Sequence, residues 1–211
     1  MTLAKICGLS TPEAVRAALD GGATHVGFVH FARSPRHVAL ETAAWLAQPA
    51  RGRARVVAVL VDPDDALLDA MARTLAPDLV QLHGRESPSR VREAAARTGA
   101  GAIKALPVSE AADLDAASAY DGVAEHLMFD ARPPAGAALP GGVGARFDWT
   151  LTAGRRFARP WFLAGGLDPW NVAEALAASG APGVDVSSGV ERGPGAKDPA
   201  LIAAFLRAAA A

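Results

Sequence analysis

The sequence predicts an α/β protein that forms a single (β/α)8 TIM barrel over residues 1–211. Eight short runs of β-branched and other apolar residues recur along the chain, and a segment of helical character follows each of them. Such alternation is typical of a parallel sheet, and eight units in about 200 residues favour closure into a barrel over an open sheet. No linker or internal repeat divides the chain, so we expect one domain.

The expected strands are short and evenly spaced. They cover residues 3–7, 25–29, 54–61, 79–82, 102–106, 126–129, 161–164 and 184–186. Helices are expected to begin near Thr11, Leu40, Asp65, Pro88, Glu110, Pro169 and Pro199, with a short sixth helix near 148–152. Proline or an acidic residue stands near several of these starts, which is what the first turn of a helix prefers.

One connection, residues 131–146, is long and rich in proline and glycine. It follows the sixth strand and therefore lies at the carboxyl ends of the strands, where barrel active sites are found. Loops of this length are usually functional or disordered. We expect a functional loop, with a tolerated surface insertion as the alternative.

Composition excludes several classes of function. The chain has 21 Lys plus Arg against 22 Asp plus Glu, so no basic excess is available for a nucleic-acid backbone. It shows neither a long apolar membrane segment nor the features of a signal peptide. A single cysteine and five histidines without His-Glu-x-x-His spacing predict neither a disulfide nor a metal site. We expect a soluble, cytoplasmic protein with a small-molecule partner.

Polar residues follow the seventh and eighth strands and predict a phosphate site. Loops seven and eight of a barrel usually bind phosphate, because free backbone N–H groups and helix ends favour an anion. The alternative is that both segments are merely tight turns. The candidate phosphate-binding residues are Gly165, Gly166, Ser187, Ser188 and Gly189.

Two further strand ends carry groups that could transfer protons. Cys7 ends the first strand beside Gly8, and Asp130 ends the sixth strand, so that a substrate could lie between the thiol and the carboxyl group. A thiol near positive charge can exchange protons, and a carboxyl group in a filled pocket can act as a general acid. The alternatives are an inert core cysteine and a solvated loop carboxylate.

Three more residues are candidates for contacts with a substrate. Arg36, in the long loop after the second strand, could hold a carboxylate by two parallel hydrogen bonds. His83 ends the fourth strand, and Asp185 lies on the eighth. Strand parity places Lys5 on the same face as Cys7, and Asp185 on the neighbouring strand once the barrel closes. We therefore expect Lys5 and Asp185 to form an ion pair inside the barrel.

These residues occur in blocks that resemble the phosphoribosylanthranilate isomerase family from Lys5 to about Asp198. The blocks are Lys5-Ile6-Cys7-Gly8-Leu9, Ser34-Pro35-Arg36, Gln81-Leu82-His83-Gly84, Phe147-Asp148-Trp149, Ala164-Gly165-Gly166-Leu167 with Asn171-Val172, and Val184-Asp185-Val186-Ser187-Ser188-Gly189-Val190-Glu191. Several blocks in the family's order are far more specific than any single motif.

The resemblance implies an Amadori rearrangement in tryptophan biosynthesis, from N-(5-phosphoribosyl)anthranilate to 1-(2-carboxyphenylamino)-1-deoxyribulose 5-phosphate. It implies Cys7 as general base, Asp130 as general acid and Arg36 near the anthranilate carboxylate, without a cofactor. One departure is 141–146, where family members often carry a hydroxyl residue and a lysine and this chain has Val143 and Arg146.

Two other functions remain open from the sequence. One is another phosphate-binding barrel, such as an isomerase or ribulose-phosphate epimerase, although the metal-binding His/Asp set expected of such an epimerase is not found. The other is a non-catalytic barrel that binds a phosphate ligand, against which Cys7 and Asp130 argue. A side activity on the related histidine-pathway intermediate is also open, and the chain is expected to be a monomer or a homodimer.

Overall fold

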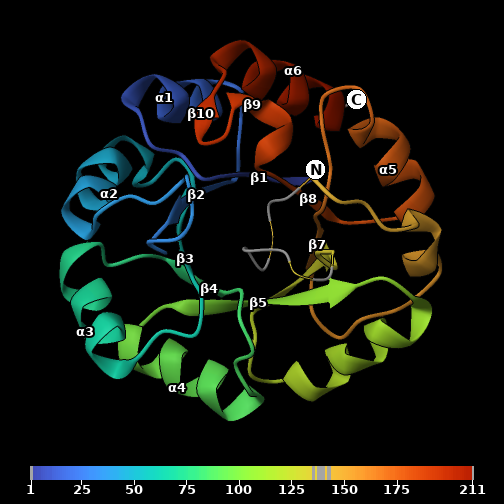
Figure 1. The fold of residues 1–211 in the computed structure, drawn as a ribbon, viewed down its shortest axis with the longest axis horizontal. Helices are drawn as coiled ribbons and strands as arrows, with labels where there is room; N and C mark the ends of the chain where they lie inside the picture. Colours follow the sequence, from blue (N-terminus) through green and yellow to red (C-terminus); the bar gives the residue numbers. More distant parts are fainter. Residues whose placement is uncertain (1, 135, 137–140, 142–143, 211) are drawn as a thin grey trace.

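The computed structural model describes residues 2–134, 136, 141 and 144–210, and it forms a closed barrel of eight parallel strands inside a ring of helices (Figure 1). The strands follow chain order, and the barrel closes where β1 (Leu3–Cys7) pairs with β8 (Gly183–Val186). Outside this closure, α1 (Pro12–Asp20) packs against α6 (Pro199–Ala210), from the other end of the chain. The predicted (β/α)8 barrel is confirmed.

The observed elements lie close to the predicted ones, and every strand boundary falls within two residues of its expected position. The remaining barrel strands are β2 (His25–Val29), β3 (Arg55–Leu60), β4 (Leu79–Leu82), β5 (Gly101–Val108), β6 (His126–Ala131) and β7 (Trp161–Leu163). The other helices are α2 (Leu40–Ala47), α3 (Asp65–Thr74), α4 (Pro88–Thr98) and α5 (Val172–Ser179), with 3₁₀ helices η1 (Gln48–Ala50), η2 (Ala111–Tyr120), η3 (Trp149–Thr152) and η4 (Ser188–Val190). In the part of the chain that the structure describes, no helix is long and apolar enough to cross a bilayer.

Two expected helices differ in kind or in start. The segment after Glu110 is a 3₁₀ helix, because Leu114, Ala117 and Tyr120 contact the core at a spacing of three residues, which matches the 3₁₀ repeat. Helix α5 begins at Val172 and not near Pro169. The Asp168 carboxylate accepts hydrogen bonds from the backbone N–H groups of Trp170 and Asn171, and these bonds stabilise a turn before the helix.

A small antiparallel hairpin after β8 was not predicted. It consists of β9 (Glu191–Gly193) and β10 (Ala196–Lys197) and stands apart from the barrel sheet. Its strands have three and two residues, too few for an alternating pattern to be recognised. The hairpin contributes two buried charged side chains to the functional site described below.

Strand parity divides the core into two layers. Side chains such as Ile6, Ala58 and Phe129 pack outward against the helices, whereas their neighbours Cys7, Val59 and Met128 pack inside the barrel. The two sets alternate along each strand, as the strand repeat of two requires. Cys7 therefore faces the interior, as its assignment to a site at the strand ends demands.

The barrel interior contains a buried ion pair at its closure. Lys5 is completely buried, and its Nζ lies 2.8 Å from Asp185 Oδ1, so the pairing predicted from parity is confirmed. Burial opposes the charge of Lys5, but Asp185 and Cys7 outweigh it and raise the Lys5 pKa. Gly27 leaves room for the ammonium group, since a Cβ there would lie 3.0 Å from Lys5 Nζ.

Two histidines fill the opposite end of the barrel, where β2 and β6 begin. His25 and His126 are both buried and pack edge-on or tilted against Phe162, with ring centroids 5.1 and 5.4 Å from it. Burial, together with the charges of His126 and Lys5, lowers the pKa of His25 to about 3. Burial also lowers the pKa of His126. This end of the barrel therefore favours neutral imidazoles.

We expect the free energy of unfolding to fall as the pH drops from 6.5, the ordinary histidine value, towards about 3, the folded value for His25. In this window the unfolded state binds a proton that folded His25 does not, so the loss approaches about 1.4 kcal/mol per pH unit. Urea unfolding across the window measures the slope. His25→Gln should flatten it more than the exposed control His37→Gln, whose pKa burial and His30 also lower; equal slopes in wild type and His25→Gln would contradict this account.

We expect Lys5→Met to reduce the free energy of unfolding by about 3–5 kcal/mol, because it leaves the Asp185 carboxylate buried without its partner. The double variant Lys5→Met/Asp185→Leu should recover most of this loss, since both charges are then gone. The surface pair Arg53–Asp20, with side chains 52% and 62% exposed, supplies the control. Arg53→Gln should cost less than about 1 kcal/mol by the same urea titration; an equally small effect of Lys5→Met would refute the interpretation.

Candidate functional site

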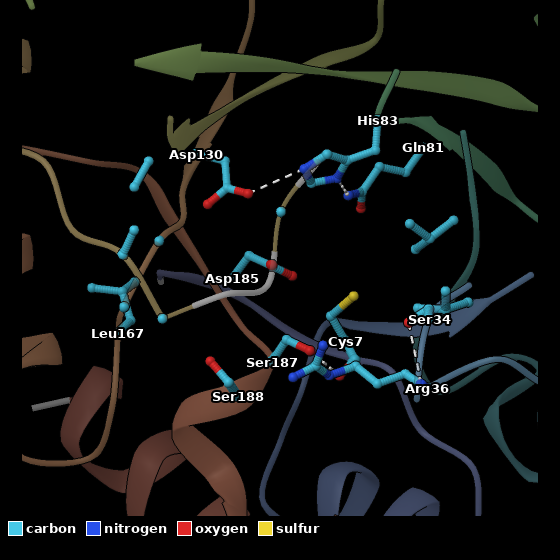
Figure 2. A pocket seen from close by; sticks show the side chains of 18 of the residues that line it. Cys7, Ser34, Arg36, Gln81, His83, Asp130, Leu167, Asp185, Ser187 and Ser188 are labelled. Carbon is cyan, nitrogen blue, oxygen red and sulfur yellow. Dashed lines mark hydrogen bonds and ion pairs between the residues drawn. The ribbon is translucent and has the colours of Figure 1, made fainter. Parts of the chain in front are cut away.

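A pocket of about 790 Å³, counted with the part open to solvent, lies where the barrel strands end (Figure 2). Nine of the ten candidate site residues line it: Cys7, Arg36, His83, Asp130, Gly165, Gly166, Asp185, Ser187 and Ser188. The tenth, Gly189, is not among the lining residues; its Cα faces the backbone carbonyl of Leu167. The structure thus gathers side chains from the ends of strands that are far apart in sequence.

Cys7 reaches the pocket from the end of β1, between two buried lysines. Burial raises the pKa of its thiol, Asp185 adds to this effect, and the ammonium groups of Lys5 and Lys197 oppose it. The thiol is therefore the favoured form in the empty pocket. Removal of its proton depends on the positive charges beside it.

Asp130 lies at the end of β6 and is hydrogen bonded to His83. The distance from His83 Nε2 to Asp130 Oδ2 is 3.1 Å, and His83 Nδ1 lies 2.8 Å from Gln81 Nε2 (Figure 2). The tautomer that carries its proton on Nε2 satisfies both contacts, accepting at Nδ1 from the Gln81 amide and donating to the carboxylate. The chain Gln81–His83–Asp130 orients the carboxyl group towards the pocket.

Two glycines allow backbone to approach the Asp130 carboxyl group closely. A Cβ at Gly165, where φ is +89°, would lie 2.7 Å from the Ala131 nitrogen and 3.1 Å from Asp130 Oδ1. A Cβ at Gly141 would lie 2.5 Å from His83 Nε2 and 2.6 Å from Asp130 Oδ2. A side chain at either position would displace the hydrogen-bonded pair.

The long loop 131–146 contributes to the pocket. Gly141, Gly144 and Ala145 line it, and Arg146 donates to the Gly166 carbonyl at 2.9 Å and to Asp168 Oδ2 at 2.9 Å. Arg146 therefore ties this loop to the loop after β7. The expected departure at 141–146 is only partly visible, since Gly142 and Val143 lie outside the described residues, as does Pro140.

Arg36 is buried over the pocket and is held by a carboxylate that the sequence analysis did not single out. Arg36 Nε donates to Glu191 Oε1 at 2.7 Å, and Nη2 donates to Oε2 at 2.9 Å. The side edge of the guanidinium is thus occupied, and the edge formed by Nη1 and the second N–H of Nη2 remains for a ligand. Gly8, with φ +77°, makes room for this side chain, since a Cβ there would lie 2.7 Å from Arg36 Cδ.

The loops after β7 and β8 are packed against each other next to the pocket. Gly165 and Gly166 both have positive φ, +89° and +63°, and Ser187 and Ser188 line the pocket beside them. The Ser187 hydroxyl donates to the Cys7 carbonyl at 3.3 Å, which joins the end of β8 to the end of β1. These loops present small residues and backbone to the pocket, as an oxyanion site requires.

Three polar residues of this region were not predicted: Gln81, Glu191 and Lys197. Gln81 could have been found, because it lies two residues before His83 and therefore on the same face of β4. For Lys197 the signal is the scarcity of lysine, of which the chain has three among 21 basic residues. Glu191 ends the last of the blocks that carry the family resemblance, but nothing in that block assigns it a role. Within the described ranges, no group of three or more His, Cys, Asp and Glu side chains forms a metal-binding cluster.

Comparison with known proteins identifies the family. The family model described as N-(5'phosphoribosyl)anthranilate (PRA) isomerase matches residues 4–208. The chain belongs to this family. Among curated relatives, N-(5'-phosphoribosyl)anthranilate isomerase of Caulobacter vibrioides is 69% identical over 206 residues, covering 97% of this chain and 94% of the relative.

Solved structures of PRA isomerases have the same fold. The enzyme from Thermotoga maritima superposes with a TM-score of 0.88 at 33% identity, covering 100% of this chain and 99% of that one. A PRA isomerase in complex with reduced 1-(o-carboxyphenylamino)-1-deoxyribulose 5-phosphate superposes with a TM-score of 0.85 at 32% identity, with the same coverage. The alternatives of an epimerase or a non-catalytic barrel therefore lose their support.

We expect His83→Asn to lower kcat about tenfold, because Asp130 loses the imidazole that orients it; general acid catalysis is worth about 10²–10⁴-fold in total. Steady-state kinetics with phosphoribosylanthranilate measure the loss. Arg85→Gln is the matched control, since Arg85 is exposed on the same loop. If His83→Asn and the control had the same kcat, the hydrogen bond to Asp130 would have no role in turnover.

Proposed function

We propose that the chain catalyses the Amadori rearrangement of N-(5'-phosphoribosyl)anthranilate to 1-(2-carboxyphenylamino)-1-deoxyribulose 5-phosphate, with Asp130 as general acid and Cys7 as general base. The observation that carries this proposal is the presence of both groups in one pocket, from the ends of β6 and β1. Family membership supports the choice of substrate.

Asp130 opens the sugar ring in this mechanism. Its carboxyl group gives a proton to the furanose oxygen, the bond between that oxygen and C1 breaks, and the anilino nitrogen forms a Schiff base with C1. Gln81 and His83 hold the carboxyl group in place for this transfer. Placement within hydrogen-bond reach of the accepting atom is the first requirement of a general acid.

Cys7 then removes the proton from C2 as a thiolate. The adjacent iminium carbon acidifies that C–H bond. The C–H electron pair forms the C1=C2 double bond while the π pair of the iminium bond moves onto the nitrogen, and the resulting enolamine tautomerises to the ketone. The charges of Lys5 and Lys197 offset part of the cost that burial imposes on the thiolate. The chemistry uses side chains alone, so we propose no cofactor.

The two ends of the substrate bind on different sides of the pocket. The free edge of the Arg36 guanidinium donates hydrogen bonds to the anthranilate carboxylate. The loops after β7 and β8 bind the phosphate, through Gly165, Gly166, Ser187, Ser188 and Gly189. His83 and Asp185 contact the sugar between them. Substrate held at both ends places C1 and C2 between acid and base, where orientation accounts for much of the rate.

The reaction would be the third stage of tryptophan synthesis from chorismate. We propose that it takes place in the cytoplasm, because the single cysteine cannot form an intramolecular disulfide, which agrees with a reducing compartment. The chain acts as a monomer or a homodimer in this proposal, which size-exclusion chromatography with light scattering would decide.

We expect Cys7→Ala and Asp130→Asn each to lower kcat by about 10²–10⁴-fold, because each removes a proton-transfer group. Loss of the substrate's fluorescence follows turnover, and circular dichroism checks that the variants fold. The exposed Arg192→Gln serves as control, with a side chain 70% exposed. Undiminished activity in Cys7→Ala would defeat the mechanism, and no turnover by the wild type would defeat the function itself.

A further inference from the structure

Lys197 is a buried cation that the mechanism above does not assign to a contact with substrate. It lies on β10, and its side chain is 1% exposed. Its Nζ donates to Glu191 Oε1 at 2.6 Å, to the Ser187 carbonyl at 2.8 Å and to the Ser187 hydroxyl at 3.3 Å. All three protons of the ammonium group have acceptors, so its position is fixed.

Ser187 connects this ammonium group to Cys7. The Ser187 hydroxyl accepts from Lys197 and donates its own proton to the Cys7 carbonyl at 3.3 Å. The hairpin that carries Lys197 thereby meets the ends of β8 and β1 at a single residue. A compact ammonium group suits this position, because its three donors all point at one serine and one carboxylate.

The charges that face Cys7 come from every element packed around it. On the barrel side, the ammonium of Lys5 is balanced by Asp185 at 2.8 Å. On the hairpin side, Arg36 and Lys197 share the single carboxylate of Glu191, at 2.7 and 2.6 Å, which leaves one net positive charge. The hairpin side therefore carries an excess of positive charge, which adds to the effect of Lys5 on a thiolate.

We propose that Lys197 is a positioning residue for catalysis, whose buried ammonium, fixed at Ser187 by the β9–β10 hairpin, stabilises the thiolate form of Cys7. This rests on the proposed role of Cys7 as general base. Lys197 acts through the field at Cys7 and not by contact with the reacting atoms.

The titration behaviour of the two residues agrees with this geometry. Burial raises the pKa of the Cys7 thiol, and the charge of Lys197 acts against that rise. Burial lowers the pKa of Lys197, while Glu191 opposes the decrease, and Cys7 as a thiolate does so as well. The ammonium of Lys197 thus favours the thiolate of Cys7, and the thiolate favours the ammonium. Such coupling is expected of opposite charges in a buried site.

The test is a direct titration of the thiol. Cys7 is the single cysteine of the chain, so the pH dependence of iodoacetamide alkylation at the thiol reports on it alone. The ultraviolet absorbance of the thiolate is read as the difference from Cys7→Ala, which removes the overlapping change of Tyr120. The variants are Lys197→Met, which removes the charge, Lys197→Arg, which keeps it, and Glu191→Gln, which removes the balancing negative charge. Arg192→Gln, on the same hairpin but 70% exposed, is the matched control.

We expect Lys197→Met to raise the midpoint of thiolate formation by about one pH unit and Glu191→Gln to lower it, because the two variants change the local charge in opposite directions. Lys197→Arg should retain most of the wild-type midpoint, and the control all of it. The alkaline shift of Lys197→Met should reappear in the pH profile of kcat/KM. Circular dichroism establishes that each variant is folded.

Three results would overturn the proposal: no change of the midpoint in folded Lys197→Met, an equal shift in Lys197→Arg, or a shift of Glu191→Gln to higher pH. If Lys197→Met does not fold, Glu191→Gln still decides, because its expected shift has the opposite sign. Thiol titration requires no turnover, so these results stand apart from any failure of the proposed isomerase activity.

Discussion

The ion pair between Lys5 and Asp185 lies where the first strand meets the last. It joins the two strands that close the barrel, and one of its members also lines the pocket. Lys5 has no exposure to solvent, and Asp185 forms part of the pocket floor. A buried charge without a partner is costly, so neither residue can be exchanged alone without a large loss. The register that brings them together, Lys5 opposite Asp185, also places Cys7 near Ser187 at the strand ends.

The other two lysines, Lys104 and Lys197, are also buried in ion pairs, and these pairs lie in the loops at the strand ends. Lys104 Nζ lies 2.7 Å from Glu86 and also donates to the Gly84 carbonyl at 2.8 Å, which fixes the loop that begins with His83. Lys197 with Glu191 fixes Arg36 and Ser187. Every lysine of the chain is thus buried beside one carboxylate, and each pair contacts a segment that carries a pocket residue.

Local patterns were sufficient for the barrel and for most of the site, because parallel strands place their carboxyl ends at one face whatever lies between them. Cys7, His83 and Asp130 could be assigned to the pocket for that reason, and the Lys5–Asp185 pair followed from parity alone. Glu191 could not be assigned in this way, since its role depends on a hairpin of seven residues that contacts the loop after β2 through Arg36. The 3₁₀ geometry of η2 was not predicted. Its core contacts, Leu114, Ala117 and Tyr120, are three residues apart, and over two such intervals this spacing also fits an α-helix with 3.6 residues per turn.

Gly141 brings main chain against Asp130 and His83, where any Cβ would collide with both side chains. The width of the pocket at this point is therefore set by the position of the Gly141 main chain and not by the size of a residue. Point substitutions at position 141 cannot narrow the opening without displacing Asp130, and none can widen it, because there is no side chain to shorten. Evolution towards larger or smaller substrates at this wall would have to proceed by insertions and deletions.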